Sequence, residues 1–410
     1  MTAKLARTGP ATVGFMSLVT AAFLGLAGCQ PPTRAVSQPA AGASASSSTL
    51  PVALASAAGS NGRPGTGPAV GEASSAPPAS TASPAMRVTT SPGIPPSLVS
   101  PPSAPLASPP TANSSGKLLF GLGPALDSDA ASPIAAGLGM FTTWYNSPSD
   151  LGFLRDWASN RIPQTYASGR SIHLVVWLDG TGKVGTNQTS HGPACGRDYP
   201  LSTAFLDDAR QLADIFKGTA GGPPLYVTLF TEFQTYACQT NAWAPSPEVT
   251  NYYLALKDKY LAAMSIFHSV APNAKVSLGW GGWQARYDDP STGGGRSMFP
   301  YFADVMRQSD FQSFQAMQSD SNSQDILDMT RMLGQYGPVM VAHFKPDNGS
   351  QKTWTADLRT LFTDAYIRQA TSMGLFALSF MDQVNLAADP TALSLVRSGI
   401  DKYGVLPAAR

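Results

Sequence analysis

The sequence predicts an α/β protein with a (β/α)8 barrel, also called a TIM barrel, and two observations support this. Eight short apolar runs recur along residues 116–410, and stretches with helical spacing separate most of them. Short, strongly apolar runs are typical of parallel strands that are covered on both faces. Strands that alternate with helices over this length indicate a closed barrel. A doubly wound sheet is the main alternative, but no GxGxxG motif opens a helix after the first run.

The expected strands are named by the apolar runs that predict them. They cover residues 117–123, 139–146, 171–180, 224–232, 274–282, 310–318, 338–345 and 374–382. Two helices have clear start signals. Ser202 is a candidate N-cap before an apolar stripe that begins at Phe205, and Ser246 is followed by Pro247 in a first turn. Further helices are expected at 297–308, 322–335, 354–373 and 391–402, with less regular ones near 131–137 and 150–167.

Residues 1–28 have the layout of a lipoprotein signal peptide. Lys4 and Arg7 precede an apolar stretch that ends in LAGC at Leu26 to Cys29. This tetrapeptide resembles the lipobox of bacterial lipoproteins, in which cleavage leaves the cysteine as the lipid-modified first residue. We expect a lipid on Cys29 and an envelope protein that faces the extracytoplasmic side. An uncleaved anchor is the alternative, but the stretch is shorter than the roughly 20 residues that comfortably span a bilayer.

Residues 29–115 are expected to be a disordered tether. They are mostly Pro, Ala, Ser, Thr and Gly, with very few charges and almost no aromatic residues. Such a composition buries too little apolar area to offset the entropy lost on folding. We interpret the segment as a flexible, partly polyproline linker that holds a domain of residues 116–410 away from the membrane.

Charge and motifs exclude several classes of function. The formal net charge of +1 gives no electrostatic case for binding nucleic acid or an anionic membrane surface. The sequence has no GxSxG, HExxH or GxxxxGK[ST] stretch, so a serine hydrolase, a zinc protease and a P-loop protein lack a supporting motif. We expect no cofactor and no metal, and we expect a monomer.

Cys195 and Cys238 are the only cysteines besides Cys29. In an exported protein they most simply form a disulfide. They follow the third and fourth expected strands, so both should lie on the same rim of the barrel. A metal site made of His191 and the two cysteines is the alternative, but it lacks a CxxC pair or a compact histidine spacing.

The candidate site follows from the strand ends, because barrel enzymes work at the C-terminal ends of their strands. Glu232 ends the fourth expected strand of a chain whose only other glutamates are Glu72 and Glu248. Flat rings stack on the C–H faces of sugars, and polar groups bind the hydroxyls. We expect a glycan site that contains Trp144, Tyr145, Trp177, Asp179, Trp280, Trp283, Gln318, His343 and Lys345. The alternative is that the aromatic rings cap the barrel core.

A carboxylate that ends the fourth strand of such a barrel resembles the acid/base glutamate of the glycoside hydrolase superfamily called clan A. The resemblance is architectural and covers about residues 117–403. It implies that Glu232 protonates the leaving oxygen of a glycosidic bond. Two departures stand out. Thr231 occupies the position where the clan usually has Asn, and the seventh strand, VMVAHFKPD, lacks the clan's nucleophilic Glu.

A mechanism with two carboxylates must therefore take its second one from an Asp. Asp382 and Asp320 are the first candidates, followed by Asp179 and Asp347. We expect a glycoside hydrolase-like protein that cleaves an envelope or extracellular polysaccharide. A non-catalytic carbohydrate-binding surface lipoprotein is the alternative, and the missing seventh-strand Glu is its best support. A solute-binding lipoprotein of an importer should instead show two lobes with separate sheets.

If residues 29–115 are only a tether, a shortened chain that begins at Ser115 should unfold at the same temperature as the full chain. A segment of this composition should make no apolar contacts with the folded domain, so removing it should not change the stability of that domain. Thermal unfolding followed by circular dichroism compares the two chains. A drop of many degrees, or an insoluble product, would show that the segment belongs to the fold.

Overall fold

The protein is described by a computed structural model that covers residues 116–178, 180–240, 246–287, 298–318, 321–345, 351–381 and 383–406, without the side chains of 351–353. The expected signal peptide and tether, with Cys29, lie outside these residues. Within the described part of the chain, no helix combines the length and the apolar character needed to cross a membrane.

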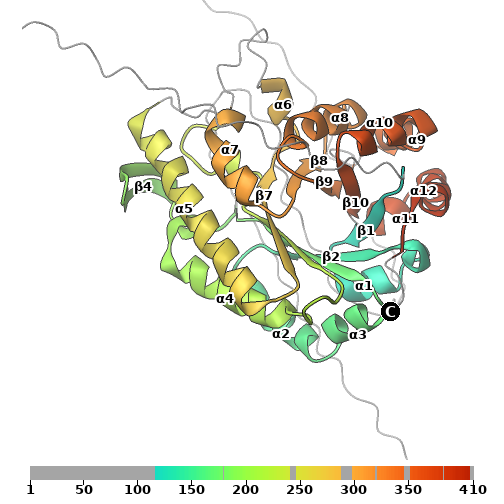
Figure 1. The fold of residues 1–410 in the computed structure, drawn as a ribbon, viewed down its shortest axis with the longest axis horizontal. Coiled ribbons are helices and arrows are strands. Elements are labelled where there is room, and N and C mark those ends of the chain that lie inside the picture. Colours follow the sequence, from blue (N-terminus) through green and yellow to red (C-terminus); the bar gives the residue numbers. More distant parts are fainter. Residues whose placement is uncertain are drawn as a thin grey trace, which may run out of the picture. The chain divides into compact units, whose positions relative to one another are not determined.

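Eight parallel strands close into a barrel in the order β1-β10-β9-β8-β7-β6-β3-β2. The strands are β1 (Leu119–Gly123), β2 (Met140–Tyr145), β3 (Ser171–Val176), β6 (Leu225–Leu229), β7 (Ala274–Trp280), β8 (Gln312–Ala316), β9 (Val339–Phe344) and β10 (Leu375–Met381). Each one falls inside an expected run, and helices surround the barrel (Figure 1). The predicted (β/α)8 fold is therefore confirmed.

The helices of the described residues follow the strands along the chain. They are α1 (Leu126–Ala130), α2 (Leu151–Ala158), α3 (Arg161–Ala167), α4 (Thr203–Phe216), α5 (Pro247–Val270), α6 (Gln284–Tyr287), α7 (Phe299–Gln308), α8 (Asn322–Leu333), α9 (Gln351–Leu361), α10 (Asp364–Ser372), α11 (Gln383–Ala387) and α12 (Pro390–Tyr403). Both predicted N-caps are confirmed. The Ser202 hydroxyl accepts from Phe205 N at 3.1 Å, and the Ser246 hydroxyl accepts from Val249 N at 3.3 Å.

Several expected helices differ from the observed ones. The expected helix at 150–167 is divided into α2 and α3, and the one at 354–373 into α9 and α10. The second helix of each pair has its own cap: Asn160 accepts from Arg161 N, and Thr363 accepts from Tyr366 N. A capping side chain gives an unpaired helix N–H a partner, so it favours a new helix start. Near 131–137 the structure has only a short 3-10 turn, Ala135–Gly137.

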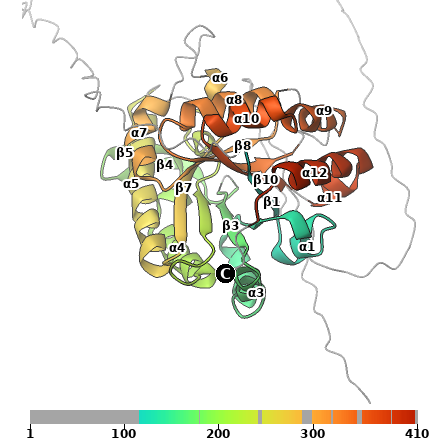
Figure 2. The same cartoon turned by 45° about the vertical axis from the view of Figure 1, so that its right-hand side comes forward.

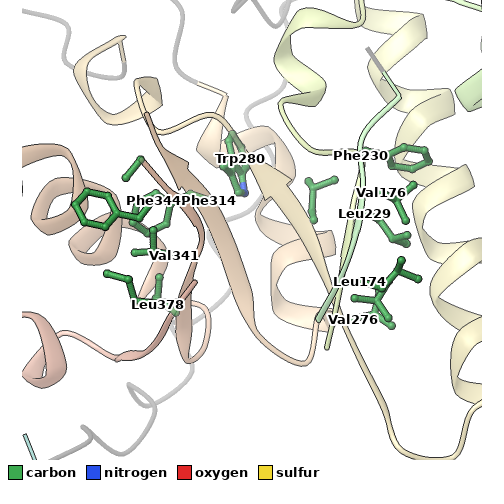
Figure 3. Packing of buried hydrophobic residues seen from close by; sticks show 14 of the residues in the cluster. Leu174, Val176, Leu229, Phe230, Val276, Trp280, Phe314, Val341, Phe344 and Leu378 are labelled. Atoms are coloured by element: carbon green, nitrogen blue, oxygen red, sulfur yellow. The ribbon is translucent and has the colours of Figure 1, made fainter. Parts of the chain in front are cut away.

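The main core lies between the outer face of the barrel and the helices. Figure 3 shows part of this layer, in which branched aliphatic and aromatic side chains from neighbouring strands pack together. Leu174, Val227, Val276 and Leu378 are completely buried there. Side chains alternate along a strand. Because these residues point outward to the helices, the residues between them point into the lumen.

The lumen contains three levels of side chains. The level nearest the N-terminal ends of the strands is apolar and contains Leu119, Met140, Phe311, Met340 and Ala377. The level nearest the C-terminal ends contains Trp144, Val175 and Met381. Between them lies a completely buried polar level made of Thr142, His173, Thr228, Ser277, Ser313 and Ser379. The barrel is therefore filled, as barrels of this size are.

Hydrogen bonds connect the polar level around His173. Its Nε2 lies 2.9 Å from Thr228 Oγ1, and its Nδ1 lies 3.4 Å from Thr142 Oγ1. Thr228 donates onward to Ser313 at 3.1 Å, and Thr142 Oγ1 lies 2.7 Å from Ser379 Oγ. Burial lowers the pKa of His173 from 6.5 to about 3. The imidazole therefore stays neutral in the folded protein near neutral pH.

This buried histidine should make stability depend on pH. Below its ordinary pKa the unfolded chain binds a proton that the folded chain does not, so His173 costs stability as the pH falls from 6.5 toward 3. The loss should be about 1.4 kcal/mol for each pH unit. Urea unfolding of wild type and His173→Gln at pH 7.5 and pH 5.0 measures it. Between these pH values the wild type should lose about 2 kcal/mol more than the variant.

The exposed and non-titrating Thr186, replaced by Ser, is the control, and this variant should follow the wild-type pH dependence. Equal losses for wild type and His173→Gln would show that His173 does not couple proton binding to folding.

Candidate functional site

Glu232 lies just past the C-terminal end of β6 in a strained backbone conformation. Its φ is 59° and that of Phe230 is 55°, and both are in the left-handed region. That region is uncommon for residues with a side chain, and each instance costs on the order of 1–3 kcal/mol. The side chain of Glu232 is only 9% exposed. Strain of this kind is concentrated at functional sites, so it points to Glu232 independently of its residue type.

Backbone hydrogen bonds hold Glu232 between two neighbouring strands. Glu232 N donates to Gly279 O of β7 at 3.0 Å, and Thr231 N donates to Val176 O of β3 at 3.0 Å. The carbonyl of Glu232 accepts from Thr235 N at 2.9 Å and from Thr235 Oγ1 at 2.8 Å. The strained turn is therefore fixed on both sides, which keeps the carboxylate in one place.

Two buried side chains hold the turn after Glu232. The Tyr236 hydroxyl donates to Thr231 O at 2.9 Å and accepts from Leu178 N at 2.9 Å. Gln234 Oε1 accepts from Gly281 N at 3.1 Å. These bonds connect the turn to the segments that follow β3 and β7. The carboxylate is thus carried by a supported turn and not by a free loop.

The aromatic residues around Glu232 in sequence turn away from the lumen. The ring of Phe230 lies 4.8 Å from that of Phe205 on α4, and the ring of Phe233 lies 4.8 Å from that of Trp280. Tyr236 packs edge-on to Phe230 at 6.4 Å. These rings therefore anchor the turn in the layer between barrel and helices.

A hairpin that the sequence analysis did not predict covers this turn. Strands β4 (Val184–Thr189) and β5 (Gly192–Arg197) are antiparallel and lie against α5 (Figure 1 and Figure 2). The amide of Asn251 on α5 donates to Pro193 O at 2.9 Å. The residues of β4 are mostly polar and exposed, so the hairpin has no apolar run by which it could be recognised.

The predicted disulfide between Cys195 and Cys238 is confirmed, with a Cα–Cα distance of 5.4 Å. It joins β5 to the segment that follows the Glu232 turn. Cys238 N also donates to Cys195 O at 3.1 Å, and Arg197 N donates to Tyr236 O at 2.9 Å. The hairpin and the turn are therefore held together by covalent and backbone links.

An irregularity in β9 turns His343 into the lumen. The pairing with β8 passes from Phe314↔Val341 directly to Gln315↔His343, so β9 contains one extra residue there. Val341 and Phe344 both belong to the outer core. His343 instead contacts Trp144 of the inner group, with ring centroids 4.7 Å apart. Bulges of this kind often re-aim a side chain next to a functional site.

The pair Trp144–His343 closes the lumen below the barrel mouth. β2, which carries Trp144, is separated from β9 by β1 and β10 in the barrel order, so the contact crosses the lumen. Burial, and after it the coulombic effect of the neighbouring His173 and Lys345, holds the pKa of His343 well below its usual range. Its imidazole is therefore neutral, and it can both donate and accept hydrogen bonds.

Several polar atoms near this end of the barrel have no hydrogen-bond partner among the described residues. They are Trp144 Nε1, Trp177 Nε1, Gln315 Oε1 and His343 Nε2. The side chains of Trp144, Gln315 and His343 are only 3%, 3% and 4% exposed. Buried polar atoms in proteins nearly always have partners, so this group is suited to bind a polar ligand or solvent.

Other predicted site residues lie elsewhere in the fold. The Tyr145 hydroxyl donates to Asp208 of α4 at 2.7 Å, so this ring points away from the lumen. Trp280 is completely buried against Phe299 of α7 at 4.6 Å. Trp283 is 7% exposed. These placements agree with the alternative that the aromatic rings pack in the core. They do not support contact between these rings and a substrate.

The rim also carries Gln318 and Lys345, which are both half-buried. Asn322 ties them together, because its side chain accepts from Gln318 N at 2.6 Å and donates to Lys345 O at 3.2 Å. The candidates for the second carboxylate are outside the described residues, namely Asp179, Asp320, Asp347 and Asp382. Their roles stay predictions. Within the described residues, no group of three or more His, Cys, Asp or Glu could hold a metal ion.

The structure has a low similarity to several solved glycoside hydrolases. A psychrophilic glycoside hydrolase family 10 endo-β-1,4-xylanase is 9% identical over 65% of this chain and 86% of its own, with a TM-score of 0.41. The β-1,4-mannanase of the common sea hare Aplysia kurodai is 12% identical over 72% and 96%, with a TM-score of 0.40. GH5_18 from Streptomyces cattleya, solved in complex with GlcNAc, is 11% identical over 70% and 80%, with a TM-score of 0.44.

The barrel architecture that the resemblance implies is confirmed by the closed sheet itself. The chain forms the closed eight-stranded barrel, and these similar solved structures are glycoside hydrolases. At these identities and scores the likeness carries no argument about activity. No protein-family model matches the sequence. No curated protein matches it either.

Removing the disulfide should destabilise the protein and loosen the Glu232 turn. The bond closes a loop with a sequence separation of 43, which is worth about 4 kcal/mol in the chain-entropy model. The variant Cys195→Ser/Cys238→Ser should lose up to this amount in urea unfolding, and its Glu232 amide should exchange hydrogen faster. Wild type treated with dithiothreitol should match it. An unchanged urea midpoint would contradict the prediction.

Proposed function

We propose that this protein is a glycoside hydrolase-like enzyme that cleaves an envelope or extracellular polysaccharide by acid/base catalysis. The observation that carries the proposal is the placement of Glu232. Glu232 lies just past the C-terminal end of a barrel strand and has a left-handed backbone. Its own N–H bonds to one neighbouring strand, and the N–H of Thr231 bonds to the other. Barrel enzymes place their catalytic groups at this end, and a buried carboxyl group is suited to give a proton to a leaving oxygen.

In the proposed reaction Glu232 donates its proton to the glycosidic oxygen as the bond to the anomeric carbon breaks. A second carboxylate then stabilises or attacks that carbon, or activates a water molecule for the attack. Asp382, Asp320 and Asp179 come after β10, β8 and β3 in the sequence and are the candidates for this role. A separation of about 5 to 5.5 Å from Glu232 would give retention, and one of roughly 6.5 to 9.5 Å would give inversion.

The proposed substrate is an oligosaccharide or polysaccharide. Its support is the chemistry of the barrel mouth, where the indole of Trp144 contacts the imidazole of His343 and Gln315 is the strand-register partner of His343. Aromatic faces stack on sugar rings, and the polar atoms can bind hydroxyls. We further propose that a lipid on Cys29 and the tether of residues 29–115 hold the barrel outside the membrane of a bacterial cell, on the basis of the LAGC motif and the tether composition.

The decisive variant is Glu232→Gln, which keeps the size and most hydrogen bonding of the side chain but removes its proton. A glycan array identifies what the wild type binds, and hydrolysis of that glycan is then measured for both proteins. Turnover should fall by roughly 10²- to 10⁴-fold in the variant while binding persists. The control is Glu248→Gln, an exposed glutamate at the start of α5, which should hydrolyse at the wild-type rate.

Equal hydrolysis by wild type and Glu232→Gln would show that Glu232 is not the acid. Binding without any hydrolysis by the wild type would support the alternative, a non-catalytic carbohydrate-binding protein. The presence of His343 in place of a carboxylate on β9 fits that alternative.

A further inference from the structure

We propose that Trp144, Gln315 and His343 form a hydroxyl-binding subsite at the floor of the barrel mouth, and that this floor subsite selects a neutral sugar unit over an acidic one. The inference rests on the proposed function, since it names the class of sugar taken by the same mouth. Its basis is the set of polar atoms that these three buried side chains leave without a partner among the described residues.

The three side chains belong to one end of one lumen. Gln315 of β8 and His343 of β9 are direct partners in the strand register, so their side chains are neighbours. Trp144 reaches His343 across the lumen from β2. Val175 and Met381 fill the same level of the lumen as Trp144, and in the polar level beneath it the hydroxyls bond to one another and to His173. A ligand that enters the mouth can therefore meet these three groups and go no deeper.

The chemistry of the three groups determines what they can bind together. An indole N–H only donates, and the Gln315 carbonyl oxygen only accepts. His343 is neutral and adds one donor or acceptor. A hydroxyl accepts from the indole and donates to the amide, so it satisfies both. A carboxylate has no proton to give and would leave the amide oxygen unpaired, which is costly in a buried site. The floor subsite therefore fits a neutral sugar and disfavours a uronic acid whose carboxylate faces the floor.

Binding should be measured in the Glu232→Gln background, so that hydrolysis does not change the ligand. Isothermal titration uses xylotetraose, mannotetraose and cellotetraose as neutral probes and tetragalacturonate as the acidic probe. At least one neutral probe should bind, and it should bind more tightly than the acidic probe. Adding Trp144→Phe or Gln315→Met should weaken its binding roughly threefold to tenfold, since each removes one hydrogen bond and keeps the approximate shape.

Trp354→Phe is the matched control. Trp354 is completely buried, and its Nε1 also lacks a partner among the described residues, but it packs in the helix layer against Phe344. Its loss should leave the titrations unchanged. Circular dichroism of each variant checks that the fold persists, and a variant that unfolds is replaced by His343→Phe, which should weaken binding in the same way.

Three results would overturn the inference: unchanged affinity in both floor variants, tetragalacturonate binding as tightly as the best neutral probe, or no binding by any probe. These results are distinct from failure of the proposed enzyme. Hydrolysis that needs Glu232 but is indifferent to Trp144 removes only the floor subsite. Neutral-sugar binding that depends on Trp144, without hydrolysis, removes only the enzyme.

Discussion

The structure depends on one constraint, namely that eight parallel strands must cover both of their faces. Helices cover the outer face with aliphatic and aromatic side chains, and closure of the sheet covers the inner face with its own residues. Strand residues alternate between these two environments. When one residue packs outward on a helix, the residues next to it in the strand therefore face the lumen. The polar level around His173 and the group around Trp144 both follow from this alternation.

The strands could be predicted from the sequence because their outward side chains are apolar and their lumen side chains are apolar or uncharged. Helix starts were also recognisable where a capping side chain preceded an apolar stripe, as at Ser202 and Ser246. The breaks at Asn160 and Thr363 were missed, because the apolar pattern continues across each break and a capping residue inside a helical pattern resembles any polar surface residue. The hairpin β4–β5 was missed because it is a polar ribbon held by a disulfide and by α5.

The site was predictable to the extent that it follows from strand ends. This rule led to Glu232, but it could not say which residue of an end faces the lumen. Tyr145 and Trp280 come at strand ends and point into the helix layer, whereas Trp144 points inward. The left-handed backbone at Phe230 and Glu232 is a property of tertiary structure, because neither residue type favours it.

The extra residue in β9 makes the chemistry of the barrel mouth depend on the length of a strand. If alternation were strict after Val341, Ala342 would face the lumen and His343 would face the helix layer. Deleting His343 would restore that alternation with Val341 and Phe344 still outward, and it would put the methyl group of Ala342 where the imidazole stood. Descendants of such a barrel can therefore gain or lose a catalytic or binding group through a single-codon insertion or deletion, while the hydrophobic layer around the strands stays intact.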